Sequence, residues 1–91
     1  MSDVARSRVV VHGHVQGVFF RDTCRRQAEA RGVAGWITNR PDGAVEAVFE
    51  GDPDDVAALV EFCRHGPRGA EVTSVEESSE ALEGLSGFRI G

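Results

Sequence analysis

The feature that most constrains the fold is a short turn that joins a strand-like segment directly to a helix-like segment. Residues 6–12 are rich in valine, which is typical of a β-strand, and residues 19–31 carry apolar side chains at the spacing of an α-helix. The turn between them contains Gly13 and Gly17 and no acidic residue. A strand-to-helix turn of this kind can direct several backbone N–H groups into one concavity, which predicts an anion site.

The rest of the chain alternates strand and helix patterns. Residues 33–39 and 44–50 are expected to be strands, and the Pro-Asp-Gly turn between them favours a hairpin. A second helix is predicted to start at Asp52, a good N-cap followed by proline, and to end before Gly66. Two further strands are expected, a polar one at 70–78 and a short terminal one at 88–90.

The element order is β-α-β-β-α-β with a short extra C-terminal strand, which predicts an α+β fold. Because crossover connections are right-handed, both helices should lie on one face of a mainly antiparallel sheet, as in the ferredoxin-like α/β sandwich. A chain of 91 residues forms one domain with a modest core. We therefore expect a single domain over residues 1–91, with residues 1–5 as a loose N-terminal tail.

Charge is distributed unevenly along this chain of net charge −5. Residues 1–40 contain seven arginines and three acidic residues, whereas residues 41–91 contain three arginines and twelve acidic residues. The first half, which includes the glycine turn, should therefore attract anions. An acidic protein with a local basic site suits a small anion better than a long nucleic acid, so we expect no nucleic-acid partner.

Several sequence patterns indicate the cellular location of the protein. Cys24 and Cys63 fall at apolar positions of expected helices, which predicts buried free thiols. No apolar run approaches the roughly 18 residues of a membrane span, and the N-terminus lacks the apolar region of a signal peptide. We expect a cytoplasmic protein without membrane contact, and a monomer is the default for a small acidic domain.

Two polar residues are candidates for chemistry. Arg21 stands at the expected start of a helix, where the helix dipole disfavours a cation unless an anion accompanies it. Its guanidinium can hold two phosphate oxygens, although a solvated helix arginine is the alternative. Asn39 precedes the Pro-Asp-Gly turn, where its amide either caps the turn or contacts a water molecule. The glycine spacing alone leaves phosphate binding and tight backbone geometry equally open.

Other types of site find little support in the sequence. His12 and His14 would point the same way on a strand, but no third ligand is evident nearby, so we expect no metal site. The glycine turn matches neither a Walker A loop nor a dinucleotide-binding fingerprint. We expect no cofactor.

Three segments together resemble the acylphosphatase family. They are GHVQGVFFR at 13–21, GWITN at 35–39 and DGAVE at 42–46. The similarity extends from about residue 6 to the terminal residues 88–90, and the paired motifs are far more specific than either motif alone.

The resemblance implies a small metal-independent enzyme that hydrolyses acyl phosphates to a carboxylate and inorganic phosphate. By resemblance, Arg21 binds the phosphate and Asn39 positions the attacking water. The backbone N–H groups of the loop are expected to bind the substrate phosphate, through His14, Val15, Gln16, Gly17 and Val18. His14 stands where other members often carry arginine, so substrate affinity or its pH dependence can differ.

Two functions of other classes compete with this interpretation. The first is a non-catalytic module on the same fold that senses phosphate or another anion, or that mediates an interaction. The second is a small RNA-binding sheet protein. The net charge of −5, the absence of tyrosine and the lack of an aromatic-basic strand motif disfavour the RNA-binding protein.

Overall fold

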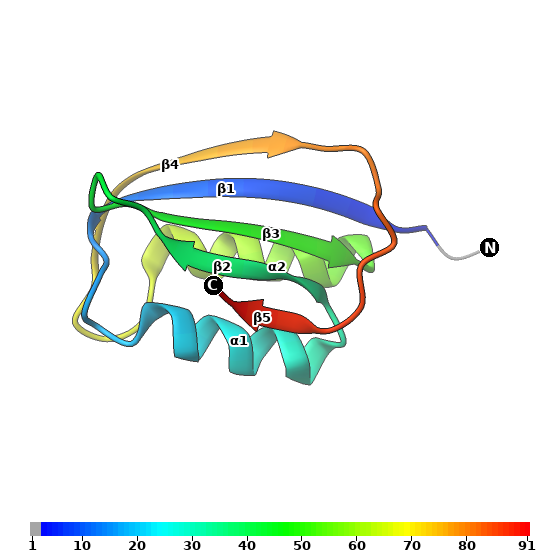
Figure 1. Cartoon of the computed structure of the whole chain (residues 1–91), viewed down its shortest axis with the longest axis horizontal. Helices are drawn as coiled ribbons and strands as arrows, with labels where there is room; N and C mark the ends of the chain where they lie inside the picture. The colour runs from blue at the N-terminus through cyan, green and yellow to red at the C-terminus, as the bar shows by residue number, and fades with distance from the viewer. Residues whose placement is uncertain (1–2) are drawn as a thin grey trace.

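The computed structural model describes residues 3–91 and shows one β-sheet with two helices packed on it (Figure 1). The chain forms, in order, β1 (Ala5–His14), α1 (Phe20–Arg31), β2 (Ala34–Asn39), β3 (Val45–Gly51), α2 (Pro53–His65), β4 (Glu71–Ser79) and β5 (Phe88–Ile90). Every expected element is present, with its ends shifted by at most two residues. The expected tail at residues 1–5 lies partly outside the described residues, and β1 already begins at Ala5.

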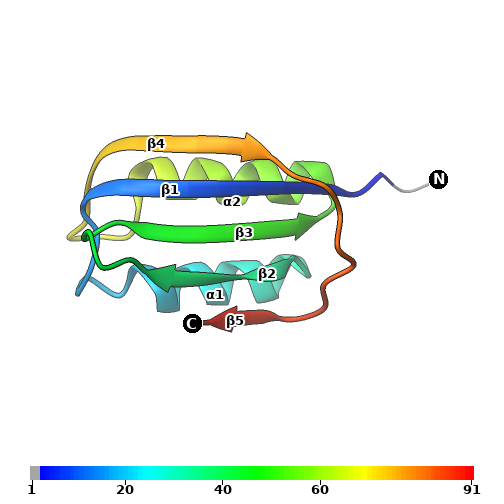
Figure 2. The ribbon, with the colours of Figure 1, turned by 45° about the horizontal axis from the view of Figure 1, so that its top comes forward.

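The strands form a five-stranded sheet in the order β4-β1-β3-β2-β5, which Figure 2 shows side by side. All neighbours pair antiparallel except β2 and β5, which are parallel. This mainly antiparallel sheet confirms the predicted ferredoxin-like α+β fold. The parallel pair places Ile90 opposite Ile37, so the last strand runs toward the same end of the sheet as Asn39.

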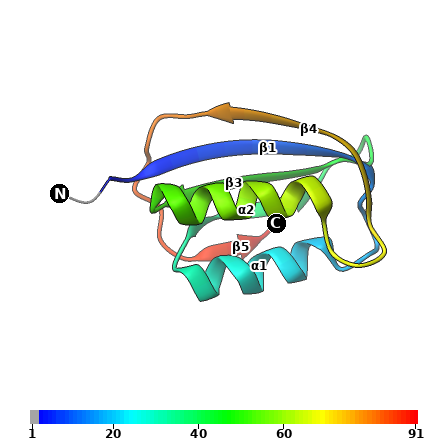
Figure 3. The ribbon, with the colours of Figure 1, turned by 180° about the vertical axis from the view of Figure 1, so that it is seen from behind.

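Both helices cover the same face of the sheet, as the view from behind shows (Figure 3). Phe20, Cys24 and Ala28 form the buried side of α1, at the four-residue spacing of a helix face. The buried residues of α2 are Val56, Leu59, Val60 and Cys63. Both cysteines are free and buried, as predicted. Within residues 3–91, no helix is long and apolar enough to cross a membrane.

The connection from β4 to β5 is tied to the sheet by the buried carboxylate of Glu50. This carboxylate accepts the backbone N–H groups of Glu83 and Leu85, each at 3.0 Å. Arg6 donates to the same carboxylate at 3.2 Å. These donors hold the pKa of Glu50 below its ordinary value, and the hydrogen bond from the N–H of Glu83 contributes most. The contact therefore holds the connection that leads into β5, which pairs with β2.

Candidate active site

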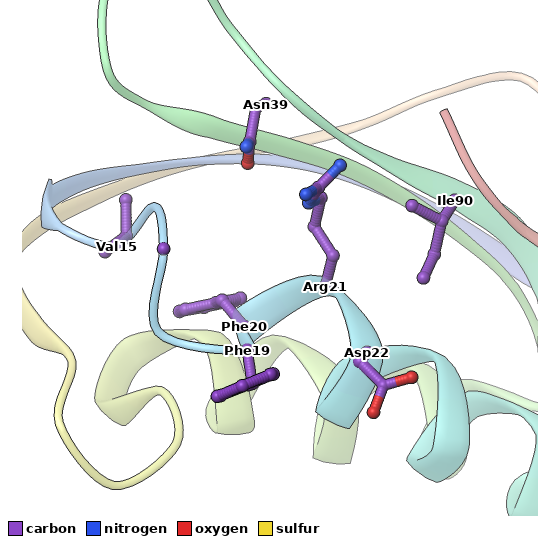
Figure 4. Close-up of a pocket in the computed structure, with 8 residues that line it drawn as sticks. Val15, Phe19, Phe20, Arg21, Asp22, Asn39 and Ile90 are labelled. Atoms are coloured by element: carbon purple, nitrogen blue, oxygen red, sulfur yellow. The ribbon is translucent and has the colours of Figure 1, made fainter.

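An open pocket of about 250 Å³ lies where the loop after β1, the start of α1 and the end of β2 meet (Figure 4). The residues that line it are Val15, Gly17, Phe19, Phe20, Arg21, Asp22, Asn39 and Ile90. They come from three separate segments of the chain, residues 15–22, Asn39 and Ile90, so the pocket forms only when the sheet and α1 are assembled.

The loop between β1 and α1 depends on glycine at two points. A register shift of β1 against β4 occurs at Gly13, whose φ is 128°. A Cβ atom at Gly13 would lie 2.1 Å from the carbonyl oxygen of Glu71, so no other residue fits without movement of the backbone. Gly17 has a φ of 75°, which glycine adopts at little cost. Val15 is 1% exposed and anchors the loop in the core.

The N-terminus of α1 opens onto this pocket without a cap. Phe19 precedes the helix in the left-handed conformation, with a φ of 61°, and no side chain of the described residues caps the first turn. An α-helix leaves the N–H groups of its first turn without intrahelical partners. The side chain of Phe20 is buried in the core and that of Asp22 points away from the pocket (Figure 4). The pocket therefore includes the open first turn of α1, whose N–H groups are available to a ligand.

Arg21 extends from this first turn toward Asn39, as Figure 4 shows. Seven of the ten arginines have a carboxylate within 4.0 Å, but no such partner is found for Arg21 within residues 3–91. A cation at the positive end of a helix is electrostatically unfavourable unless an anion lies nearby. The arrangement therefore favours binding of an anion at Arg21.

Asn39 ends β2 and shares the helix-facing side of this strand with Ile37, which is 0% exposed. Its side-chain amide points into the pocket (Figure 4). The Oδ1 atom is buried, and no hydrogen-bond partner is found for it in the described part of the chain. Leaving such an acceptor unsatisfied costs about 1–3 kcal/mol. A water molecule or ligand donor in the pocket would remove that cost.

Asp22 is the acidic residue at the pocket, and its carboxylate is held elsewhere. Arg25 donates to it at 2.9 Å, and Arg26 forms a second ion pair with it. The hydrogen bond from Arg26 is the main cause that lowers the pKa of Asp22. Asp22 therefore stays ionised, and its carboxylate is turned away from the pocket. In this orientation it is poorly placed to accept a proton from a water bound in the pocket.

The predicted site residues fall into two groups. The pocket brings together Arg21, Asn39, Val15 and Gly17. His14, Gln16 and Val18 are not among the residues that line it. His14 is exposed, and Val18 packs against the core. The amide of Gln16 donates instead to two carbonyl oxygens of the β2–β3 hairpin.

Ile90 also lines the pocket, although no motif in the sequence marks it. Its place depends on the parallel pairing of β5 with β2, which joins segments about 50 residues apart and leaves no local motif. No group of three or more potential metal-ligating side chains occurs within residues 3–91.

Comparison with known proteins identifies the family. The acylphosphatase family model matches residues 7–90. An acylphosphatase of Haloarcula marismortui is 52% identical over 85 residues, which are 93% of each chain. The structure of an acylphosphatase from Coxiella burnetii superimposes with a TM-score of 0.93 at 37% identity, covering 98% of this chain and 94% of the other. The Bacillus subtilis acylphosphatase gives a TM-score of 0.91 at 36% identity, covering 96% and 98%. The chain belongs to the acylphosphatase family.

Proposed function

We propose that this chain hydrolyses acyl phosphates to a carboxylate and inorganic phosphate in the pocket at the start of α1. One observation carries the proposal. Within residues 3–91, an arginine without a carboxylate partner, at an uncapped helix N-terminus, faces an amide whose buried oxygen also lacks a partner. The guanidinium of Arg21 can bind a phosphate and the amide of Asn39 can bind a water molecule, and hydrolysis requires both. The similarity to acylphosphatases over residues 7–90 supports the same activity for one domain spanning residues 1–91.

The phosphate is proposed to bind to Arg21 and to backbone N–H groups of the loop and the first turn of α1. A guanidinium holds two phosphate oxygens at once, and a helix N-terminus adds N–H donors and a partial positive charge. Phosphoryl transfer depends mainly on positioning and on stabilisation of charge on the equatorial oxygens. The same groups can therefore bind the substrate and stabilise the transition state.

Asn39 is proposed to orient the water that attacks phosphorus. Its Oδ1 atom accepts a hydrogen bond from this water, which satisfies the buried acceptor. The water oxygen forms a new bond to phosphorus while the bond from phosphorus to the acyl oxygen breaks, and the carboxylate leaves. Because a carboxylate is a weak base, its departure needs no general acid. The proton of the water passes to a phosphoryl oxygen or to the departing carboxylate, since Asp22 is held by two arginines.

We also propose that the protein acts as a cytoplasmic monomer that does not bind nucleic acid. The net charge of −5 supports the absence of nucleic-acid binding, because it disfavours contact with a polyanion. The arginines of the sheet add further support, since Arg6 and Arg8 are occupied by glutamates rather than left free for phosphates.

Metal-free turnover of benzoyl phosphate tests the proposed function. In the presence of EDTA the protein should release benzoate and phosphate, and inorganic phosphate should inhibit competitively. Binding of phosphate without turnover would contradict the proposal and favour an anion-sensing module on the same fold. A protein that neither turns over benzoyl phosphate nor binds phosphate would contradict both.

A further inference from the structure

The side chain of Gln16 leaves the pocket loop and reaches the hairpin between β2 and β3. Its Nε2 atom donates to the carbonyl oxygen of Arg40 at 2.8 Å and to that of Ala44 at 2.9 Å. The two donor hydrogens of the amide are therefore both used on the hairpin. This contact crosses from one wall of the pocket to the other.

Gln16 and Arg40 are each adjacent in sequence to residues that line the pocket. On the loop, the neighbours of Gln16 are Val15 and Gly17, which both line the pocket. On the hairpin, Arg40 directly follows Asn39. Gln16 is thus placed to set the separation between the loop and Asn39.

The hairpin itself closes without Gln16. The N–H group of Arg40 donates to the carbonyl of Ala44 at 2.8 Å, and the N–H group of Gly43 donates to the carbonyl of Arg40 at 3.1 Å. Each carbonyl that Gln16 contacts therefore already has a backbone donor. Because a carbonyl oxygen accepts two hydrogen bonds, Gln16 adds a second donor to each without being required for the turn.

We propose that Gln16 is a positioning residue that holds the phosphate-binding loop and Asn39 at the separation needed for attack by water. This inference rests on the proposed function. It assigns to Gln16 a role through its side chain, beyond the backbone contact expected for every residue of the loop. Catalysis is sensitive to such alignment, because a misplacement of about 1 Å can cost roughly 100-fold in rate.

Gln16→Met tests the role because it keeps the side-chain length and removes both donors. Measured on benzoyl phosphate, it should lower kcat about tenfold while KM and the inhibition constant of inorganic phosphate stay within about threefold of wild type. Gln27→Met is the matched control, because Gln27 is also half-buried but lies on α1 outside the pocket. It should leave kcat unchanged.

A double-mutant cycle with Asn39→Ala distinguishes positioning from a general structural role. If Gln16 acts through Asn39, Gln16→Met should cause little further loss of kcat once Asn39 has been removed. An equal loss in both backgrounds would overturn the inference. So would a loss of phosphate affinity at unchanged kcat, because Gln16 would then serve phosphate binding alone.

Gln16→Glu provides a second measurement on a side chain of the same shape. Its ionised carboxylate has no donor and faces two carbonyl oxygens, whereas its protonated form can donate to one of them. The kcat of Gln16→Glu relative to that of Gln16→Met should therefore rise as the pH falls, and a constant ratio would overturn the inference.

If Asn39→Ala alone keeps wild-type kcat, the proposed role of Asn39 fails and this inference fails with it. A normal loss for Asn39→Ala with an additive loss for Gln16→Met overturns the role of Gln16 only.

Discussion

The N-termini of the two helices are built in opposite ways. At α2, Asp52 accepts the N–H groups of Asp54 at 2.9 Å and Asp55 at 3.4 Å, and Pro53 occupies the first turn. At α1, Phe19 adopts a left-handed conformation, and Arg21 places a cation beside the positive end of the dipole. No side chain in the part of the chain that the structure describes caps this turn. One terminus is satisfied by its own residues, and the other is left open.

The difference separates residues that stabilise the fold from residues available for a ligand. Capping and acidic first-turn residues each stabilise a helix, and α2 has both, whereas α1 has the acidic residue Asp22 but no side-chain cap within residues 3–91. Phe19, which precedes α1, is 79% exposed, so burial of its ring does not offset the cost of its backbone conformation. An anion bound at α1 would supply the negative charge that Asp52 supplies at α2. The unfavourable features of α1 are therefore expected to become favourable in the phosphate complex.

The largest expected effect follows from removal of the cation at the open terminus. Arg21→Ala should lower kcat/KM for benzoyl phosphate about 100-fold or more, because both phosphate binding and stabilisation of the transition state are lost. Arg26→Ala is the control on the same helix, since Arg26 is exposed and paired with Asp22. Near wild-type hydrolysis by folded Arg21→Ala would show that the open terminus is not the phosphate site.

The next effect concerns the amide that faces the open terminus. Asn39→Ala should lower kcat about 10- to 100-fold, because the attacking water loses its orientation. The inhibition constant of inorganic phosphate should change little, since Arg21 and the main chain remain. Steady-state kinetics with phosphate as inhibitor measure both quantities. Loss of phosphate affinity with intact single-turnover chemistry would assign Asn39 to binding instead.

Removal of the cap at the closed terminus should affect stability alone. Asp52→Ala should lower the free energy of unfolding by about 1 kcal/mol, the usual value of an N-cap. Urea denaturation measures this loss, and kcat/KM should stay at the wild-type value because α2 begins at the opposite end of the sheet from the start of α1 (Figure 1). A fall in kcat/KM comparable to that of Arg21→Ala would remove the distinction between the two termini.

The smallest effect is the titration of Asp22, the acid in the first turn of α1. The hydrogen bond from Arg26 lowers the pKa of Asp22, so the ionised form is favoured in the folded protein. The resulting stabilisation is present above the ordinary aspartate pKa and is lost as the pH falls through the lowered value. Carboxyl NMR titration should find the pKa of Asp22 below the ordinary value, and Arg26→Gln should raise it. An unchanged pKa in that variant would show that the ion pair is weak in solution.

The sequence predicted best what short segments determine by themselves. Asp52 and Pro53 mark the start of α2 by local chemistry, and the structure confirms this cap. Arg21 and Asn39 were selected by their motifs, and the structure places both at one pocket. Ile90 and the amide of Gln16 could not be placed in this way, because their contacts depend on strand pairing and on a side chain that crosses between segments.

The place of β1 in the sheet has a consequence for how the chain folds. β1 lies between β3 and β4, so it pairs only with strands that are synthesised after it. Until residues 71–79 are available, one edge of this valine-rich strand has no partner. Bringing such distant segments together costs chain entropy before their contacts stabilise the fold. The domain should therefore fold more slowly than a helical bundle of the same length.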